Sequence, residues 1–433
     1  MSILKWKDPT GSNKANSQRD LILLYERRSI IYVAPGLFAN SRPFAYIRVV
    51  MKIGFDAKRA FHNSTGLGYY SRTLISLLSE YYPGNEYYLF NTKPSSKYSF
   101  TQSNVNEILP AGFPATLFRS AWRSKWVVKD VKKLGIDLYH GLSHEIPVGI
   151  NDTGARSIVT IHDLIHERYP AQYNPIDIKI YTAKYKYACK HADRIIAISE
   201  QTKQDIIDFY GIPSSKIDVC YQSCSPLYAQ QASVAEKKSI AWKYHLPEKF
   251  FLSVGTINER KNMLNVCKAM FLLRNDLELP LVVIGKGSGS YFNKVKDFIL
   301  QNNLEKKVIF LSEMEEAKTD RTFLQTEDLP AIYQQATAML YPSFFEGFGA
   351  PVMEALWSRL PVITSNVSCL PEVGGDAAWY VNPDSAEEIA EGMRRIYHDP
   401  ALASSMKEKG WAHAQKFAPD IYVQSVMNTY KSL

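Results

Sequence analysis

Apolar runs of strand length alternate with amphipathic helical stretches along most of this chain. The first clear unit begins at Met51, where MKIGFDA has the composition of a buried strand, and a helix is predicted over 66–82. Such alternation is typical of βαβ units, which build parallel sheets. The alternation lapses into a polar segment over 224–238 and resumes at Phe250 with FFLSVGT. The pattern therefore predicts an α/β protein with two Rossmann-like, doubly wound domains facing a central cleft.

The same pattern divides the chain into four segments. The first fifty residues fit neither domain, and Met51 could itself be a start codon, so we interpret them as a disordered or misassigned leader. The alternative is a genuine extension that anchors or regulates the protein. A charged stretch, Glu313–Glu327, interrupts the second series and is expected to form a surface loop. The segments are the leader (1–50), an N-terminal domain (51–228), a C-terminal domain (229–415) and a helix (416–433) expected to return to the first domain.

Composition narrows the class of protein. A chain of 433 residues is too long for one core, which supports two domains. The net charge is +8, but the first fifty residues hold eight basic and three acidic residues, so only +3 belongs to the remainder. Without a nucleic-acid-binding motif, this charge does not predict a nucleic-acid partner. Five cysteines without a C-x-x-C pair indicate neither a disulfide framework nor a zinc site, and no apolar run is long enough to span a membrane. We expect a cytoplasmic protein.

Two glutamates follow a predicted strand of the second domain, in the run YPSFFEGFGAPVMEAL. Glu346 is expected in the loop and Glu354 on the helix that begins near Gly349. Ligands of open parallel sheets bind at the carboxyl ends of the strands. Gly347 and Gly349 would let the backbone approach a ligand, and the helix N-terminus favours an anion. The simpler interpretation is that one glutamate stabilises the helix N-terminus by its charge and the other is solvated. The presence of both glutamates together with two glycines favours carboxylates that bind sugar hydroxyls.

Two adjacent cations, Arg260 and Lys261, follow the strand in FLSVGTINERKN. They suit a diphosphate, whose negative charge must be neutralised as it leaves. The chain contains no D-x-D tripeptide, which would supply metal-binding carboxylates. We therefore expect cationic side chains in that role and no metal cofactor. The competing interpretation is an ordinary surface pair of cations.

The first domain carries weaker signals. Gly66 and Gly68 lie between a strand and a helix, in a turn compatible with a phosphate. Ser71 stands where a dinucleotide-binding motif has its third glycine, and Asn91 ends the next strand, so a dinucleotide dehydrogenase is disfavoured. His162 ends the strand SIVTI and is expected to point into the cleft. Taken alone, such a histidine is more often structural than catalytic.

Together these segments resemble the retaining GT-B glycosyltransferases of family 4, which include bacterial mannosyl- and glucosyltransferases of polysaccharide assembly. The resemblance extends from Met51 to the C-terminus and is strongest from YPSFFEGFGAPVMEAL through PVITSNVSCLPEVGGDAAWYVNP. It implies that the N-terminal domain binds the acceptor and the C-terminal domain binds the nucleotide-sugar donor.

The resemblance also implies roles for the donor half. Glu346 would contact hydroxyls of the donor sugar, beside Gly347 and with backbone amides near Phe348 and Gly349 assisting. Glu354 would hold the ribose.

Other roles follow from the same resemblance. Arg260 and Lys261 would neutralise the diphosphate, and His162 would lie beside the donor sugar near the reacting centre. Gly66 and Gly68 would line the phosphate and acceptor side. The leaving phosphate would itself take the acceptor proton in a same-face displacement, so that no protein nucleophile is required.

Two departures from the family pattern affect these expectations. Thr256 stands where many relatives carry an arginine, which leaves the phosphate clamp to Arg260 and Lys261. The usual Asn-Gly before the linker is replaced at 222–224, so the hinge geometry is not predicted.

The resulting hypothesis is a retaining, metal-independent hexosyltransferase of cell-surface polysaccharide biosynthesis, such as lipopolysaccharide. Its donor would be a nucleotide diphosphate sugar, with mannose mildly preferred, and its acceptor a glycan or lipid-linked oligosaccharide. The alternatives are a nucleotide-sugar epimerase or hydrolase of similar fold and a non-catalytic sugar-nucleotide-binding protein.

A basic aromatic stretch at 113–135 suggests a surface for the membrane. Phe118, Trp122 and Trp126 alternate with lysines and arginines, as in helices that lie on anionic membranes. An ordinary helix with a buried aromatic stripe would show the same spacing. The hypothesis is peripheral contact at the inner face of the plasma membrane.

Overall fold

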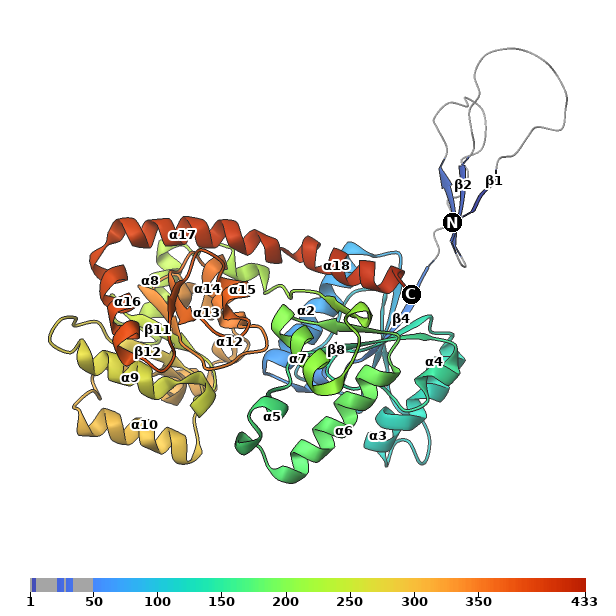
Figure 1. The fold of residues 1–433 in the computed structure, drawn as a ribbon, viewed down its shortest axis with the longest axis horizontal. Coiled ribbons are helices and arrows are strands. Elements are labelled where there is room, and N and C mark those ends of the chain that lie inside the picture. The colour runs from blue at the N-terminus through green and yellow to red at the C-terminus, as the bar shows by residue number, and fades with distance from the viewer. Residues whose placement is uncertain (1, 5–21, 27–28, 34–49) are drawn as a thin grey trace, which may run out of the picture.

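The first domain is built on a seven-stranded parallel sheet (Figure 1). The computed structural model describes residues 2–4, 22–26, 29–33 and 50–433. The strand order is β10-β9-β8-β7-β4-β5-β6, and every neighbouring pair is parallel. The strands are β4 (Lys52–Asp56), β5 (Glu86–Phe90), β6 (Val105–Ile108), β7 (Leu138–Gly141), β8 (Arg156–Ile161), β9 (Arg194–Ala197) and β10 (Ile217–Val219).

The second domain repeats this architecture with six parallel strands in the order β13-β12-β11-β14-β15-β16. These strands are almost entirely buried because helices cover both faces, which explains their continuous apolar sequences. The predicted α/β fold with two doubly wound domains is confirmed. The strands are β11 (Phe251–Val254), β12 (Leu281–Ile284), β13 (Val308–Phe310), β14 (Ala338–Tyr341), β15 (Val362–Ser365) and β16 (Trp379–Val381).

Helices connect the strands of both domains. No helix in the described part of the chain combines the length and apolar composition that crossing a membrane requires. Those of the first domain are α1 (Lys58–His62), α2 (Gly66–Tyr81), α3 (Arg119–Ala121), a π-helix (Trp122–Trp126), α4 (Val127–Leu134), α5 (Ile165–Arg168), α6 (Pro175–His191) and α7 (Glu200–Tyr210). Those that follow are α8 (Val234–Lys243), α9 (Met263–Leu272), α10 (Gly289–Gln301), α11 (Glu315–Thr319), α12 (Arg321–Leu324), α13 (Leu329–Tyr333), α14 (Ala350–Trp357), α15 (Leu370–Gly374), α16 (Ala386–His398), α17 (Pro400–Ala414) and α18 (Pro419–Lys431).

The last two helices run along one side of both domains (Figure 1). Helix α17 packs on α14 of the second domain, and α18 crosses to α2 of the first. There the hydroxyl of Tyr430 lies 2.7 Å from Nδ1 of His140, a residue of β7. The last helix, α18, therefore packs against the first domain.

The first fifty residues are described only in part. Within them, β1 (Ser2–Leu4), β2 (Ile22–Glu26) and β3 (Ser29–Val33) form an antiparallel sheet. The rest of the segment up to residue 49 lies outside the described residues, so the interpretation of 1–50 as a leader stays a prediction.

The expectation of a surface loop over Glu313–Glu327 is wrong. The segment contains α11 and α12, and it buries the side chains of Ala317 and Phe323. Its end also contacts the first domain, because the hydroxyl of Tyr69 donates to Oγ1 of Thr326 at 2.9 Å. Two buried side chains among many charged ones give too weak a periodicity to indicate a helix, so tertiary packing decides the conformation.

Candidate active site

The two domains touch where the loop after β14 meets the carboxyl end of β8 and the start of α7, which follows β9. The carbonyl of Gly347 accepts hydrogen bonds from Oγ of Ser199 (2.7 Å) and Oγ1 of Thr202 (3.3 Å). A Cβ atom on Gly347 would lie 2.1 Å from the carbonyl oxygen of His162. Gly347 is therefore required for contact between the domains, whereas the sequence suggested close approach to a ligand.

Glu346 lies between the two predicted cations. Its Oε2 is 2.8 Å from Nη1 of Arg260 and its Oε1 is 2.9 Å from Nζ of Lys261. Burial opposes ionisation of this carboxyl, but attraction from Lys261 and Arg260 outweighs it and lowers the pKa of Glu346 to about 2. The carboxylate is thus charged and buried, with its charge balanced by two side chains at the carboxyl end of β11.

The turn before α9 presents these cations. Residues 259–261 form a 3₁₀ turn, and the side chain of Asn258 accepts a hydrogen bond from the backbone N–H of Lys261. Asn262 continues with a positive φ of 64°, and its amide donates to the carbonyls of Pro342 and Pro383. These contacts tie the cationic turn to the loops after β14 and β16, which holds Arg260 and Lys261 against Glu346.

Glu354 lies on α14, apart from this ion cluster. The hydroxyl of Tyr333 donates to its Oε2 at 2.7 Å. Burial raises the pKa of Glu354 to about 7, although hydrogen bonds from Tyr333 and Tyr228 act in the opposite direction. This carboxyl therefore changes charge near neutral pH, unlike Glu346.

The start of α14 depends on glycine. Gly349 is the N-cap residue and has a φ of +93°, a conformation that other residues rarely adopt. Phe348 before it is buried against Phe417 and Tyr221, with ring centroids 5.8 and 6.3 Å away. The Phe348 side chain thus supports the loop from behind, and only the backbone of 348–349 is left to face a ligand.

His162 is buried at the domain contact. Its Nε2 lies 2.8 Å from the carbonyl oxygen of Leu142, and its ring packs edge-on against Tyr70, 4.5 Å between centroids. Burial lowers the pKa of His162 to about 4, with the Leu142 carbonyl opposing. The ring is neutral near pH 7. Because a carbonyl only accepts, Nε2 carries the proton and Nδ1 is free to accept one hydrogen bond.

Backbone N–H groups of the predicted glycine turn in the first domain are hydrogen-bonded to a side chain of the protein itself. Oδ1 of Asn63 accepts the backbone N–H groups of Thr65 (2.7 Å) and Gly68 (3.2 Å). A Cβ atom on Gly68 would lie 1.9 Å from the carbonyl oxygen of Asn63, whereas one on Gly66 would meet nothing within 4 Å. Gly68 is thus needed for a tight turn, and Gly66 leaves open space at the start of α2.

Sequence reasoning missed Glu372, which lies on α15 of the second domain. Its carboxylate accepts the backbone N–H groups of Glu200 (2.8 Å) and Gln201 (2.9 Å) at the start of α7 in the first domain. It also accepts a hydrogen bond from the hydroxyl of Tyr221. A single glutamate in a short helix gives no sequence signal for a cap on a distant helix.

The predicted helix over 113–135 is shorter than expected. It begins at Arg119 and ends at Leu134, where Gly135 adopts the left-handed conformation. Trp122 is buried and its indole N–H donates to Asp130, so this tryptophan belongs to the core. The turn before the helix leaves three large apolar side chains exposed: Phe113 by 83%, Leu117 by 66% and Phe118 by 53%.

The cysteines and the other metal-ligating side chains of the described residues form no recognisable metal site. All five cysteines are free and buried. Within the described residues, no group of three or more His, Cys, Asp or Glu side chains is arranged to hold a metal ion.

Comparisons with known proteins match both domains. Residues 66–223 match the family described as Glycosyltransferase Family 4, and residues 236–413 match Glycosyl transferases group 1. The chain is 27% identical over 400 residues to O-antigen chain mannosyltransferase B of Escherichia coli, covering 88% of this chain and 100% of that protein.

Solved structures resemble the whole two-domain architecture. Sucrose-phosphate synthase from Thermosynechococcus elongatus matches with a TM-score of 0.70 at 19% identity, covering 88% of this chain and 98% of the other. Anabaena HepE in complex with UDP-glucose matches with a TM-score of 0.66 at 16% identity, covering 88% and 100%. These similarities establish the GT-B arrangement of the two domains.

Proposed function

Since the chain belongs to the GT-B glycosyltransferases, with a family 4 domain followed by a group 1 domain, we propose that it is a retaining, metal-independent hexosyltransferase. It moves a sugar from a nucleotide diphosphate donor to a glycan or lipid-linked acceptor in cell-surface polysaccharide biosynthesis. The observation that carries the proposal is the buried cluster of Glu346, Arg260 and Lys261 at the contact between the domains.

Donor binding requires an exchange of partners in this cluster. The diphosphate carries negative charge and interacts with Arg260 and Lys261, whose present counter-ion is Glu346. Once the phosphates balance the cations, the Glu346 carboxylate becomes free to accept hydrogen bonds from hydroxyls of the sugar. Glu354, on the next helix, accepts hydrogen bonds from the ribose hydroxyls in its ionised form. The two cations thus keep an anionic partner throughout, and sugar hydroxyls hydrogen-bond to the Glu346 carboxylate in place of the cations.

The transfer step needs no protein nucleophile. The bond from the sugar C1 to the phosphate oxygen breaks, and the acceptor oxygen forms a new bond to C1 on the same face. The acceptor proton passes to an oxygen of the leaving phosphate, which departs as a nucleoside diphosphate. The two cations stabilise the charge that develops there, and Nδ1 of His162 accepts a hydrogen bond from a hydroxyl beside C1.

The donor sugar is proposed from the relatives. O-antigen chain mannosyltransferase B supports mannose, and therefore GDP-mannose, since the similarity covers that entire protein. A structural relative was solved with UDP-glucose, which makes this the competing donor. The buried clamp itself contacts the diphosphate and sugar, so it does not discriminate between the two bases.

Thermal unfolding in a panel of nucleotide sugars tests the proposal. We expect GDP-mannose or UDP-glucose to raise the melting temperature, equally with and without EDTA. Proton NMR of the product should then show the anomeric configuration of the donor retained. An EDTA-sensitive reaction would contradict metal independence, an inverted product would contradict retention, and conversion of the donor without an acceptor would indicate an epimerase or hydrolase.

We also propose that the chain contacts the membrane through the turn 113–118 and the outer side of α3 and α4. Arg119, Lys125 and Lys129, in the helical segment that follows this turn, are exposed. Exposed apolar groups followed by exposed cations suit the boundary of an anionic bilayer, where a lipid-linked acceptor is anchored.

A further inference from the structure

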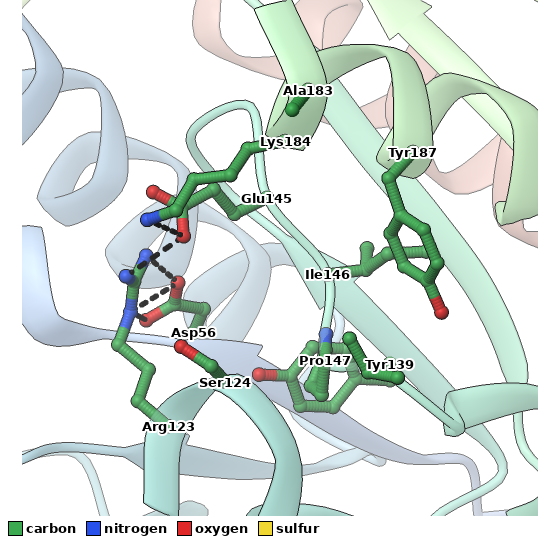
Figure 2. A pocket seen from close by; sticks show the side chains of 11 residues that line it. Asp56, Arg123, Ser124, Tyr139, Glu145, Ile146, Pro147, Ala183, Lys184 and Tyr187 are labelled. Carbon is green, nitrogen blue, oxygen red and sulfur yellow. Dashed lines mark hydrogen bonds and ion pairs between the residues drawn. The ribbon is translucent and has the colours of Figure 1, made fainter. Parts of the chain in front are cut away.

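A cavity of about 230 Å³ lies in the first domain, where β4, β7 and α6 converge (Figure 2). Asp56 ends β4, at the same edge of the sheet as His162 at the end of β8. Ligands of parallel sheets bind at this edge. The other lining residues come from the π-helix, from β7 and the loop after it, and from α6: Arg123, Ser124, Tyr139, Glu145, Ile146, Pro147, Val148, Ala183, Lys184 and Tyr187.

Four charged side chains form a row along one side of the cavity (Figure 2). The guanidinium of Arg123 donates to both carboxylate oxygens of Asp56, at 2.9 and 3.0 Å from Nε. Its Nη1 donates to Glu145 at 3.1 Å, and the same Glu145 oxygen accepts from Nζ of Lys184 at 3.2 Å. Two anions and two cations alternate, so the row carries no net charge.

This balance indicates the class of ligand. A phosphate would require unpaired cations, and a metal ion would require unpaired carboxylates. Hydroxyl groups both donate and accept, so they can hydrogen-bond to Glu145 and Lys184 together. Across the cavity lie Tyr187 and Ile146 (Figure 2), which offer an apolar surface to the C–H groups of a sugar ring. The space is smaller than the roughly 300–1,000 Å³ of sites for drug-sized ligands, which suits a single sugar residue.

We infer that this cavity is a subsite for one uncharged sugar residue of the acceptor. The inference rests on the proposed function and adds to it the place and class of the acceptor residue. Glu145 and Lys184 bind its hydroxyls, and Arg123, which itself pairs with Asp56, holds Glu145 in position.

The cavity is one aromatic layer away from His162. The ring of His144, next to Glu145 in the chain, lies 5.1 Å from the His162 ring between centroids. Its other neighbour is Tyr185, stacked at 4.2 Å and next to Lys184 on α6. A sugar bound in the cavity therefore neighbours the centre where the donor reacts, on the side of the first domain.

Two of the lining residues can be changed with little risk to the fold. Ala183 and Lys184 are exposed on α6, and the Lys184 side chain is 45% exposed. Ala183→Trp fills the cavity without altering its charges, whereas Lys184→Ala removes a donor and leaves the space. Lys179→Ala is the matched control, because Lys179 is exposed on the same helix and does not line the cavity.

The test uses the full-length protein, GDP-mannose or UDP-glucose as donor, and octyl glycosides of mannose, glucose, galactose and N-acetylglucosamine as acceptors. Saturation-transfer NMR measures binding of each glycoside, and product formation gives its KM. We expect at least one glycoside to bind. Ala183→Trp and Lys184→Ala should each raise its KM by about tenfold or more, while Lys179→Ala leaves it unchanged.

The possible failures are distinguishable. If no octyl glycoside binds to the wild-type protein, or if both cavity variants bind it as the wild type does, the subsite is wrong. Stronger displacement of the glycoside by mannose 1-phosphate than by methyl mannoside would overturn the uncharged class. If no nucleotide sugar stabilises the wild-type protein, it is the proposed function that fails.

Discussion

At the scale of single residues, Glu346 is proposed to pair with two cations when no donor is bound and with the donor sugar when it is. Without donor it pairs with Arg260 and Lys261, so Glu346→Gln leaves two adjacent, mostly buried cations without their carboxylate partner. We expect the free energy of unfolding to fall by about 3–5 kcal/mol and transfer to fall by about 100-fold or more. The diphosphate would replace the missing charge, so GDP or UDP should raise the melting temperature of the variant more than that of the wild type.

Glu259→Gln is the control for this experiment. Glu259 lies in the same 3₁₀ turn, but its side chain is exposed. It should change neither stability nor nucleotide response appreciably. If nucleotide stabilised Glu346→Gln less than the wild type, the exchange of anions between carboxylate and diphosphate would be refuted.

Glu354 should make stability and donor binding depend on pH near neutrality. Its pKa is about 7 in the folded protein and near 4.5 in an ordinary glutamate, so the folded state holds the proton more tightly. This contribution to stability is complete below about pH 4.5 and is lost as the pH rises through 7. Glu354→Gln cannot ionise, so its stability lacks this pH dependence. Between pH 5 and 8 its melting temperature should therefore rise relative to that of the wild type, and the difference in unfolding free energy should change by at most about 3 kcal/mol.

Nucleotide binding should show the opposite trend. Ionised Glu354 accepts hydrogen bonds from ribose hydroxyls, so wild-type affinity for GDP or UDP should rise as the pH increases through 7. Calorimetric titration at pH 6 and pH 8 measures this. Equal pH dependence in the wild type and Glu354→Gln would exclude Glu354 as the ribose ligand.

The sequence allowed us to predict that Glu346, Arg260 and Lys261 lie close together, but not that they form ion pairs or how much these pairs contribute to stability. Glu346, Arg260 and Lys261 each follow a strand of one parallel sheet, so their meeting follows from topology. Their direct ion pairing depends on side-chain geometry that no spacing encodes. The large loss of stability expected on removing Glu346 therefore follows only from the structure.

At the scale of elements, helix α7 joins the domains. Its first turn donates two backbone N–H groups to Glu372 of α15, and its N-cap residue Ser199 donates to the carbonyl of Gly347. A carboxylate is favoured at a helix N-terminus, and losing such a cap costs about 1 kcal/mol. We expect Glu372→Ala to weaken the contact between the domains and to raise the KM for donor about fivefold.

Small-angle scattering and kinetics test this element. The radius of gyration of Glu372→Ala without ligand should exceed that of the wild type and approach it when nucleotide is added. Glu391→Ala is the control, since Glu391 pairs with Arg394 on an exposed face of α16. An unchanged radius of gyration and an unchanged KM in Glu372→Ala would show that this helix cap is not needed to hold the two domains together.

The strands were easier to predict than some of the helices. Buried parallel strands such as β12 and β14 are continuous apolar runs, which stand out in any sequence. Helices α11 and α12 bury only Ala317 and Phe323 within a charged segment, so their pattern resembles a loop. The start of the helix before α4 was misplaced because Phe118 has helical spacing with Trp122 but lies outside the helix.

At the scale of the whole molecule, α18 makes the two domains one structure. One continuous cluster of buried apolar residues includes Leu74 of α2, Tyr430 of α18 and Met339 of β14. The sequence indicated two sheets and a terminal helix that returns. It could not give the relative placement of the sheets, because polar contacts such as Tyr69 to Thr326 follow no periodic pattern.

The placement of α3 and α4 leads to a prediction for the molecule as a whole. They lie at the edge of the first domain away from the second (Figure 1), so the turn 113–118 can meet a membrane without blocking the cleft between the domains. Arg123 is not part of this surface, because its side chain turns inward to Asp56 and Glu145. The exposed cations, including Lys132 and Lys133, remain to attract anionic lipid.

Co-sedimentation with vesicles measures this contact. Wild-type protein should bind vesicles containing phosphatidylglycerol more strongly than pure phosphatidylcholine, and less strongly at high salt, because screening weakens attraction between exposed charges. Replacing Phe113, Leu117 and Phe118 by serine removes the apolar surface and should lower binding about tenfold or more. Trp242→Ser is the matched control, since Trp242 is 80% exposed on α8 of the second domain. If the triple variant and the wild type bound equally, attraction between the cations and the lipid would account for all of the binding. Insertion of the turn into the membrane would then be excluded.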